Sequence, residues 1–141
     1  MSDMFFLDTN VLVYTFDRTA AAKRERAMGL VELALESGNG VISSQVVQEF
    51  LNVATRKFDV PMNTGDAVRF LHDVLAPMCE VFPSIELFQK ALVVRETTGY
   101  SVYDSLVVAA AVQAGCGTLY SEDLQDGRRV DGLTIRNPFR S

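Results

Sequence analysis

The chain has 141 residues, of which 48% are hydrophobic and 22% charged, and its net charge at pH 7 is −5. This length fits a single domain over residues 1–141, and the composition excludes disordered, collagen-like and coiled-coil proteins. An acidic chain lacks the broad basic field with which most nucleic-acid-binding proteins attract phosphate. Its charge alone therefore argues against RNA or DNA as a partner.

Short β-rich runs alternate with longer helical stretches along the chain. Strands are predicted at residues 5–7, 41–42, 80–82, 118–120 and 133–135. Helices are predicted at residues 19–37, 44–57, 64–75, 84–99 and 103–114, from apolar periodicity and from the capping and stop residues around them. The last helix is apolar on nearly every side, which indicates burial. This alternation predicts an α/β protein, a three-layer α/β/α sandwich with a central, mostly parallel sheet.

Nothing in the sequence predicts a membrane or secreted protein. The longest apolar run, Leu106 to Val112, is far shorter than the roughly 20 residues that cross a bilayer. The N-terminus has no basic flank, so no signal peptide is expected. Cys79 and Cys116 stand alone and are predicted to be free thiols. We therefore expect a cytoplasmic protein that has no membrane partner.

Four acidic residues stand near the predicted strand ends or helix starts. Asp8 follows the first strand, Glu49 lies in the helix after the second strand, Asp104 opens the buried helix, and Asp123 follows the fourth strand. Carboxylates that converge at one edge of a sheet repel each other unless a cation neutralises them. Mg²⁺ and Mn²⁺ prefer such oxygen ligands and can activate water for attack on a phosphoryl group. Together, the four acids favour a metal site.

Each acid also has an ordinary structural explanation. Asp8 can cap a short helix that starts at Thr9, and Asp104 lies in a capping box that begins at Ser101. Glu49 lies at the edge of an apolar stripe, where a solvated position is common. On a helical wheel, Asp104 shares the core-facing side with Val107, Val108 and Ala111. An unpaired charge there is costly, which favours a metal ligand over a simple cap.

The fourth acid is open between Glu122, Asp123 and Asp126. We prefer Asp123 because it stands close to the strand end, with Ser121 as a helper. The only histidine, His72, excludes a multi-histidine zinc site and a mechanism that uses paired histidines. The sequence contains neither G-x-x-x-x-G-K-[ST] nor G-x-G-x-x-G, so nucleotide hydrolysis and dinucleotide binding have no support.

Four short motifs occur in order along the chain and are followed by a distinctive C-terminal run. They are Leu7-Asp8-Thr9-Asn10, Gln48-Glu49-Phe50, Tyr103-Asp104-Ser105-Leu106 and Ser121-Glu122-Asp123-Leu124, and the run extends from Gly132 to Phe139. In these residues, and over essentially its whole length, the sequence resembles the PIN-domain family. The likeness is to the VapC-type ribonuclease toxins of bacterial toxin–antitoxin pairs.

The resemblance implies an endoribonuclease that uses Mg²⁺ or Mn²⁺ and water to cleave RNA. It implies that Asp8 and Asp104 are direct metal ligands, and that Glu49 and Asp123 orient water or hold a second ion. The polar residues expected to brace this site are Thr9, Asn10 and Ser121. The implied partners are an RNA substrate, a cognate antitoxin that covers the site, and a second copy of the chain in a homodimer.

Two other functions stay open at the level of sequence. A receiver-like phosphoacceptor module also places acids at strand ends, but it needs a lysine near the last strand, and Lys23, Lys57 and Lys90 all lie elsewhere in the sequence. A catalytically silent PIN-like domain that only binds a partner is the other alternative.

Two further groups of residues each have two explanations. Basic residues that either guide RNA or form solvated helix faces are Arg18, Lys23, Arg24, Arg26, Arg56, Lys57, Arg128 and Arg129. Apolar residues compatible with dimer contacts or with the core are Leu87, Phe88, Ala91 and Leu92.

Overall fold

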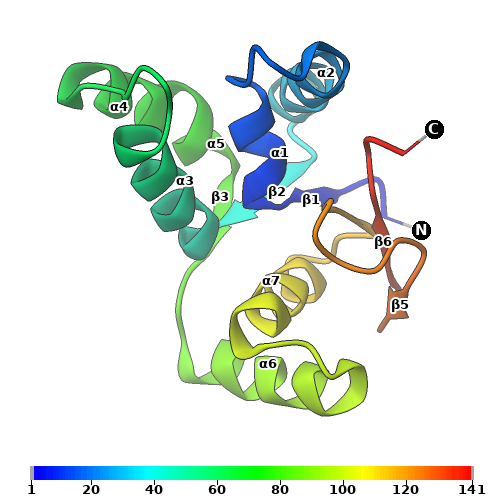
Figure 1. The fold of residues 1–141 in the computed structure, drawn as a ribbon. Helices are drawn as coiled ribbons and strands as arrows, with labels where there is room; N and C mark the ends of the chain where they lie inside the picture. The colour runs from blue at the N-terminus through cyan, green and yellow to red at the C-terminus, as the bar shows by residue number, and fades with distance from the viewer. Residues whose placement is uncertain (1, 141) are drawn as a thin grey trace.

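A six-stranded sheet in the order β3-β2-β1-β4-β6-β5 organises the chain (Figure 1). The computed structural model describes residues 2–140. The strands are β1 (Phe5–Leu7), β2 (Gly40–Ser43), β3 (Cys79–Val81), β4 (Thr118–Tyr120), β5 (Arg129–Val130) and β6 (Leu133–Arg136). All neighbouring strands are parallel except β5 and β6, which pair antiparallel. The prediction of a mostly parallel central sheet is confirmed.

Helices cover both faces of this sheet. They are α1 (Thr9–Tyr14), α2 (Ala21–Ser37), α3 (Ser44–Arg56), α4 (Thr64–Phe70), α5 (Ala76–Met78), α6 (Ile85–Thr98) and α7 (Val102–Gln113), with a π-helical turn at Leu71–Leu75. Figure 1 shows α1 and α2 on one side of the sheet and α6 and α7 on the other. The three-layer α/β/α prediction is therefore confirmed. Within residues 2–140, no helix combines the length and the apolar character needed to span a bilayer.

The centre of the sheet and helix α7 form the interior. All three residues of β1 are buried, as are Leu119 of β4 and Ile135 of β6. The run of small apolar residues in α7 is also buried, as predicted: Val107, Val108, Ala109, Ala110 and Ala111. Cys79 and Cys116 are free thiols, as expected, and burial raises the pKa of Cys116 to about 12. Neither thiol therefore ionises readily at neutral pH.

Most predicted bounds differ from the structure by one or two residues, and the most informative differences are at three places. Strand β3 begins and ends one residue earlier than predicted, and Phe82 lies outside it with 60% of its surface exposed. The helix predicted over residues 64–75 begins after Asn63, whose side chain caps it, and changes to a π-helical turn at Leu71. Strand β5 was not predicted. It pairs with β6 because the turn between them folds the chain back through Asp131 and Gly132, which both have positive φ.

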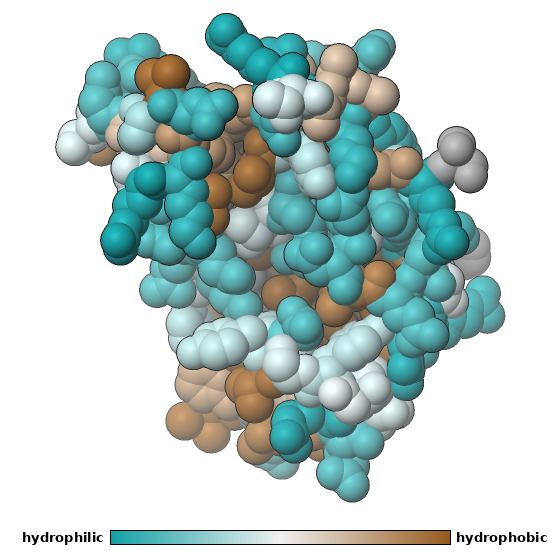
Figure 2. Space-filling view, viewed as in Figure 1, coloured by the Kyte–Doolittle hydropathy of each residue, from teal (hydrophilic) through white to brown (hydrophobic). Residues whose placement is uncertain are grey.

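Helix α6 has two apolar faces that sequence alone could not separate. Leu87 and Ala91 are buried, whereas Phe88 and Leu92 are 45% and 59% exposed. Figure 2 shows hydrophobic atoms gathered at the lower end of the molecule, where Figure 1 places α6. One face of the helix therefore belongs to the core, and the other stays on the surface of the single chain.

The connectivity brings several loops to one edge of the sheet. Strand β1 pairs with β2 on one side and with β4 on the other, so successive crossovers leave it in opposite directions. Ligands of parallel sheets bind at the carboxyl ends of the strands beside such a switch point. The residues that follow β1 and β4 there are Asp8 and Ser121. A backbone hydrogen bond of 3.0 Å from Asp8 N to Tyr120 O holds these two strand ends together.

Candidate active site

Asp8 is the buried centre of the site. It directly follows β1, only 8% of its surface is exposed, and its Oδ1 accepts a 2.8 Å hydrogen bond from Thr9 N at the start of α1. The cap that sequence offered as an ordinary explanation is therefore present. Its other oxygen, Oδ2, accepts a 2.7 Å hydrogen bond from the Ser121 hydroxyl. The carboxylate of Asp8 thus caps a helix and also joins β1 to the loop after β4.

Asn10 extends this network toward the fourth acid. Its Nδ2 donates to Asp123 Oδ2 at 3.2 Å and lies 3.4 Å from both Asp8 Oδ2 and Ser121 Oγ. Its Oδ1 accepts a hydrogen bond of 3.2 Å from Glu122 N. Asn10 belongs to α1, and its amide side chain hydrogen-bonds to the loop of residues 121–123. It therefore fixes the position of that loop relative to α1. The structure therefore brings together Asp8, Asn10, Ser121 and Asp123, while the Thr9 side chain stands outside these bonds.

Glu49 and Asp104 approach the site from two different helices. Glu49 lies in the second turn of α3 and Asp104 in the first turn of α7, where Ser101 Oγ accepts a 3.1 Å hydrogen bond from Asp104 N. A hydrogen bond of 3.2 Å from Gln45 Nε2 to Tyr103 O ties α3 to α7 beside them. Both acids are exposed. The expectation that Asp104 points along the core side of its helix is therefore wrong, because in the first turn of α7 the core buries Ser105 and leaves Asp104 exposed.

The charges of the acids influence one another. The pKa of Asp8 is raised to about 6, mainly by burial. Hydrogen bonds from Ser121 and Thr9 oppose this rise, and the negative charges of Glu49 and Asp123 add to it. Burial also raises the pKa of Glu49, and the charges of Asp104 and Asp123 add to that shift. The site thus concentrates negative charge that the protein itself does not neutralise.

The oxygen atoms at this edge match what a divalent cation requires only in part. As the side chains stand, no group of three or more His, Cys, Asp or Glu residues among 2–140 is close enough to hold a metal ion. Mg²⁺ commonly takes only one or two carboxylates and keeps several waters, so a smaller set of oxygens suffices. The Thr9 hydroxyl is buried and, in the described part of the chain, has no hydrogen-bond partner. The carboxylate oxygens of this edge, their negative charge and the unpaired Thr9 hydroxyl are together compatible with a hydrated Mg²⁺ or Mn²⁺ ion.

Glu122 and Asp123 are neighbours in sequence but have different surroundings. Glu122 forms an ion pair of 2.5 Å with Lys23 Nζ and accepts a 2.6 Å hydrogen bond from the Tyr14 hydroxyl. These contacts lower the pKa of Glu122 despite its partial burial. Asp123 instead contacts Asn10 and faces the other acids. Lys23 lies far from this loop in the sequence, yet its side chain reaches the loop after β4. There its positive charge pairs with Glu122.

The remaining predicted residues lie apart from this network. Asp126 accepts hydrogen bonds from Asn137 N at 2.8 Å and from Arg140, and so ties the 121–128 loop to the C-terminal segment. His72 is exposed in the π-helical turn. The contacts of Tyr14 and Lys23 with Glu122 were missed because no local signal announces a partner 108 or 99 residues away.

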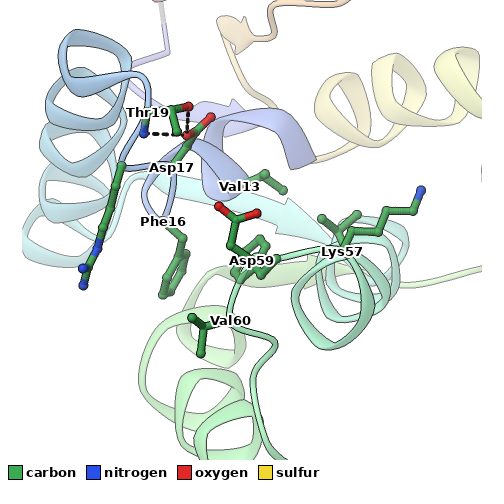
Figure 3. A pocket seen from close by; sticks show the side chains of 10 residues that line it. Val13, Phe16, Asp17, Thr19, Lys57, Asp59 and Val60 are labelled. Carbon is green, nitrogen blue, oxygen red and sulfur yellow. Dashed lines mark hydrogen bonds between the residues drawn. The ribbon is translucent and has the colours of Figure 1, made fainter.

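A separate hollow of about 630 Å³ lies further along α1 and α3 (Figure 3). Val13 and Val53, which line it, are four residues beyond Thr9 and Glu49 respectively. The hollow is therefore about one helical turn from the acidic edge on both helices. Figure 3 shows Phe16 and Val60 among the side chains that line it, and Asp17 hydrogen-bonded to Thr19. None of the four acids lines it.

The pKa of Asp8 predicts how the cation-free protein responds to pH. Its carboxyl has a pKa of about 6 in the folded chain against an ordinary value of 3.8. The folded state therefore binds the proton more tightly, and the free energy of unfolding falls as pH rises from about 4 to 7. The loss contributed by Asp8 is expected to reach about 3 kcal/mol at neutral pH. Urea unfolding in EDTA between pH 4 and 8 measures it, and Asp8→Asn is the reference variant. Equal pH dependence in both proteins would contradict the assignment.

The chain is similar to known proteins in both sequence and fold. Residues 5–133 match the PIN domain family. The chain is 33% identical over 124 residues to Ribonuclease VapC7 of Mycobacterium tuberculosis, a match that covers 85% of this chain and 82% of that protein. A toxin-antitoxin complex from Klebsiella pneumoniae contains a similar fold, with a TM-score of 0.66, 18% identity and coverage of 94% of this chain and 96% of that chain. VapC20 of Mycobacterium tuberculosis, described as a Sarcin-Ricin loop cleaving toxin, has a TM-score of 0.57, 19% identity and coverage of 84% and 89%. This chain therefore belongs to the PIN-domain family, as its ordered acidic motifs predicted.

Proposed function

We propose that this protein is an endoribonuclease that cleaves RNA phosphodiester bonds with Mg²⁺ or Mn²⁺, and that it is the toxin of a toxin–antitoxin pair. The observation that carries the proposal is the buried Asp8, whose pKa is raised to about 6 and whose carboxylate feels the charges of Glu49 and Asp123. A protein that used these acids only for folding would gain stability by replacing them. Their arrangement instead favours a bound cation. The relatives named as a ribonuclease and as toxins support the reaction class.

The residues divide into ligands and supports in this proposal. Asp8 and Asp104 are the first choices to hold the cation, and Glu49 and Asp123 orient water or hold a second ion. When bound, the cation supplies Lewis-acid activation of water and neutralises charge that develops on the phosphate. Ser121 and Asn10 hold Asp8 and Asp123 in position through the hydrogen bonds described above. Thr9, the residue that follows Asp8, has a buried hydroxyl that could serve as a further support.

The partner of the proposed toxin is a cognate antitoxin. The relative from Klebsiella pneumoniae is described as a toxin-antitoxin complex, which supports a pairing of this kind. The product of the reading frame that adjoins this gene is the protein to test. The exposed face of α6 around Phe88 and Leu92 is the surface we propose for contact with a second copy of the chain.

The test is cleavage of a mixed RNA pool by the purified protein. Cleavage is expected with Mg²⁺ or Mn²⁺, is expected to stop in excess EDTA, and is expected to return when Mn²⁺ is added back. The product of the adjoining reading frame is expected to suppress it. No cleavage by the folded protein with either ion would refute the ribonuclease. Cleavage that persists in EDTA would refute its dependence on a cation.

A further inference from the structure

Three arginines gather in a polar hollow beside the acidic edge. The hollow has a volume of about 510 Å³ and lies between α2, the ends of β4 and β6, and the C-terminal segment. Arg26 comes from α2, Arg136 ends β6, and Arg140 follows in the C-terminal segment. Arg26 is 110 residues from Arg136 and 114 from Arg140, so no local pattern predicts that they meet. The hollow is a local concentration of positive charge on a chain whose net charge is −5.

Asp126, the one acid among the described residues that line this hollow, is already engaged. Asp126 Oδ1 accepts a 2.8 Å hydrogen bond from Asn137 N, and its Oδ2 lies 3.4 Å from Arg140 Nη1. The Arg140 side chain is 70% exposed, so water weakens this ion pair and the guanidinium can turn to a different anion. Arg136 is exposed and makes no side-chain hydrogen bond within residues 2–140. The three arginines thus exceed the negative charge available to them.

Arg26 is held in place before any ligand arrives. Its Nε donates a 3.2 Å hydrogen bond to Pro138 O, and its guanidinium lies 6.0 Å from the centre of the Tyr120 ring. These two contacts use one edge and one face of the group. The two Nη atoms remain for a bidentate contact, which is the geometry in which arginine binds phosphate. A preorganised arginine loses little conformational freedom when it binds.

Backbone hydrogen bonds connect the hollow to the acidic edge. Ser121 N donates to Arg136 O at 3.0 Å, and Asp8 N donates to Tyr120 O at 3.0 Å. Asp8 and Arg136 therefore end strands that are separated only by β4. Neighbouring strands lie about 4.8 Å apart, so the two backbones are about 10 Å apart. A single-stranded nucleic acid spans such a distance within a few nucleotides.

We propose that this arginine hollow binds a phosphodiester group of single-stranded RNA, at a different position along the strand from the bond that is cleaved. The identity of this ligand rests on the proposed ribonuclease function. The hollow supplies charge and bidentate donors without any contact that reads a base, so it positions the strand and is indifferent to its sequence. It also explains how an acidic chain holds a polyanion beside four carboxylates.

Binding of a fluorescein-labelled single-stranded RNA, measured by anisotropy in EDTA over a range of salt concentrations, tests this proposal. Arg136→Gln is the main variant, because Arg136 makes no side-chain hydrogen bond that folding would lose. Its loss is expected to weaken binding roughly eightfold at 50 mM salt and to reduce the slope of log K against log salt by about 0.7. Arg136→Lys is expected to recover most of the slope. Arg95→Gln on α6 removes the same charge away from the hollow and is expected to change neither value.

Different results would overturn the proposal. Equal effects of Arg136→Gln and Arg95→Gln would show that only net charge matters. Displacement of the RNA by inorganic phosphate at an equal concentration of phosphate groups would assign the hollow to free phosphate instead. Because EDTA prevents cleavage, the binding result is independent of the reaction. RNA that binds through Arg136 without ever being cleaved would refute the proposed function but leave the phosphate-binding hollow in place.

Discussion

The Asp8→Asn variant is expected to lose RNA cleavage by on the order of a thousandfold while remaining folded. Asparagine has the same shape as aspartate and is an equally good helix cap, so its Oδ1 can keep the bond from Thr9 N. Its Nδ2 cannot accept from the Ser121 hydroxyl as Asp8 Oδ2 does, but it can donate to Ser121 Oγ instead. What disappears is the negative charge that a cation requires. Because that charge is buried, its removal is expected to raise the thermal stability of the cation-free protein.

The rate of RNA cleavage with Mn²⁺, measured together with the melting temperature, checks both parts of this expectation. Asp3→Asn is the matched control, because Asp3 is exposed and its substitution removes the same charge at a position outside the site. It is expected to leave both the rate and the melting temperature unchanged. Full activity in a folded Asp8→Asn protein would remove Asp8 from the proposed set of metal ligands.

Phe50→Ala is expected to destabilise the fold by about 3–5 kcal/mol. Phe50 is fully buried and stacks on Phe70 with ring centres 4.9 Å apart, and Phe16 and Phe58 complete the cluster. A cavity there separates α3 from the segment around Phe70. The melting temperature is expected to fall by roughly 10–20 °C. Glu49 is the neighbour of Phe50 on α3, so a loosened helix is also expected to slow RNA cleavage.

Circular dichroism during heating measures this loss of stability. Phe88→Ala provides the comparison, because it removes an identical side chain that is 45% exposed on α6. Its effect on the single chain is expected to stay within about 1 kcal/mol. If the two variants melted at the same temperature, the aromatic cluster around Phe50 would not be the support of α3 that its packing indicates.

Sequence predicted the parts of the fold whose cause is local. Residues 5–7 and 118–120 are short apolar runs followed by polar residues, and both are strands with the predicted bounds. Strand β5 was missed because its two residues carry no alternation of their own. The signal lay in the Asp131-Gly132 pair, a sequence that favours a tight hairpin turn, and both residues have positive φ. The π-helical turn at Leu71–Leu75 has no such marker, and it places Leu75 in the core.

In the candidate site, too, sequence predicted the features that have a local cause and not those that depend on distant contacts. The meeting of Asp8, Ser121 and Asp123 follows from where strands end, which a sequence pattern reveals. The choice between Glu122 and Asp123 depends on Lys23 and Tyr14, which reach Glu122 from distant parts of the chain. Tertiary contacts of this kind settle which of two adjacent acids carries an ion pair. The roles of the four acids in catalysis remain predictions for the variants above.

The two outer strands of the sheet bear on how the protein resists aggregation. Strand β3 has three residues and β5 has two, so each edge offers few unpaired backbone groups to another chain. Short edge strands hinder the strand-to-strand pairing that leads to fibres. Copies of this protein are therefore expected to associate through side-chain surfaces. A concentrated preparation should accordingly form discrete assemblies and not amyloid-like polymers.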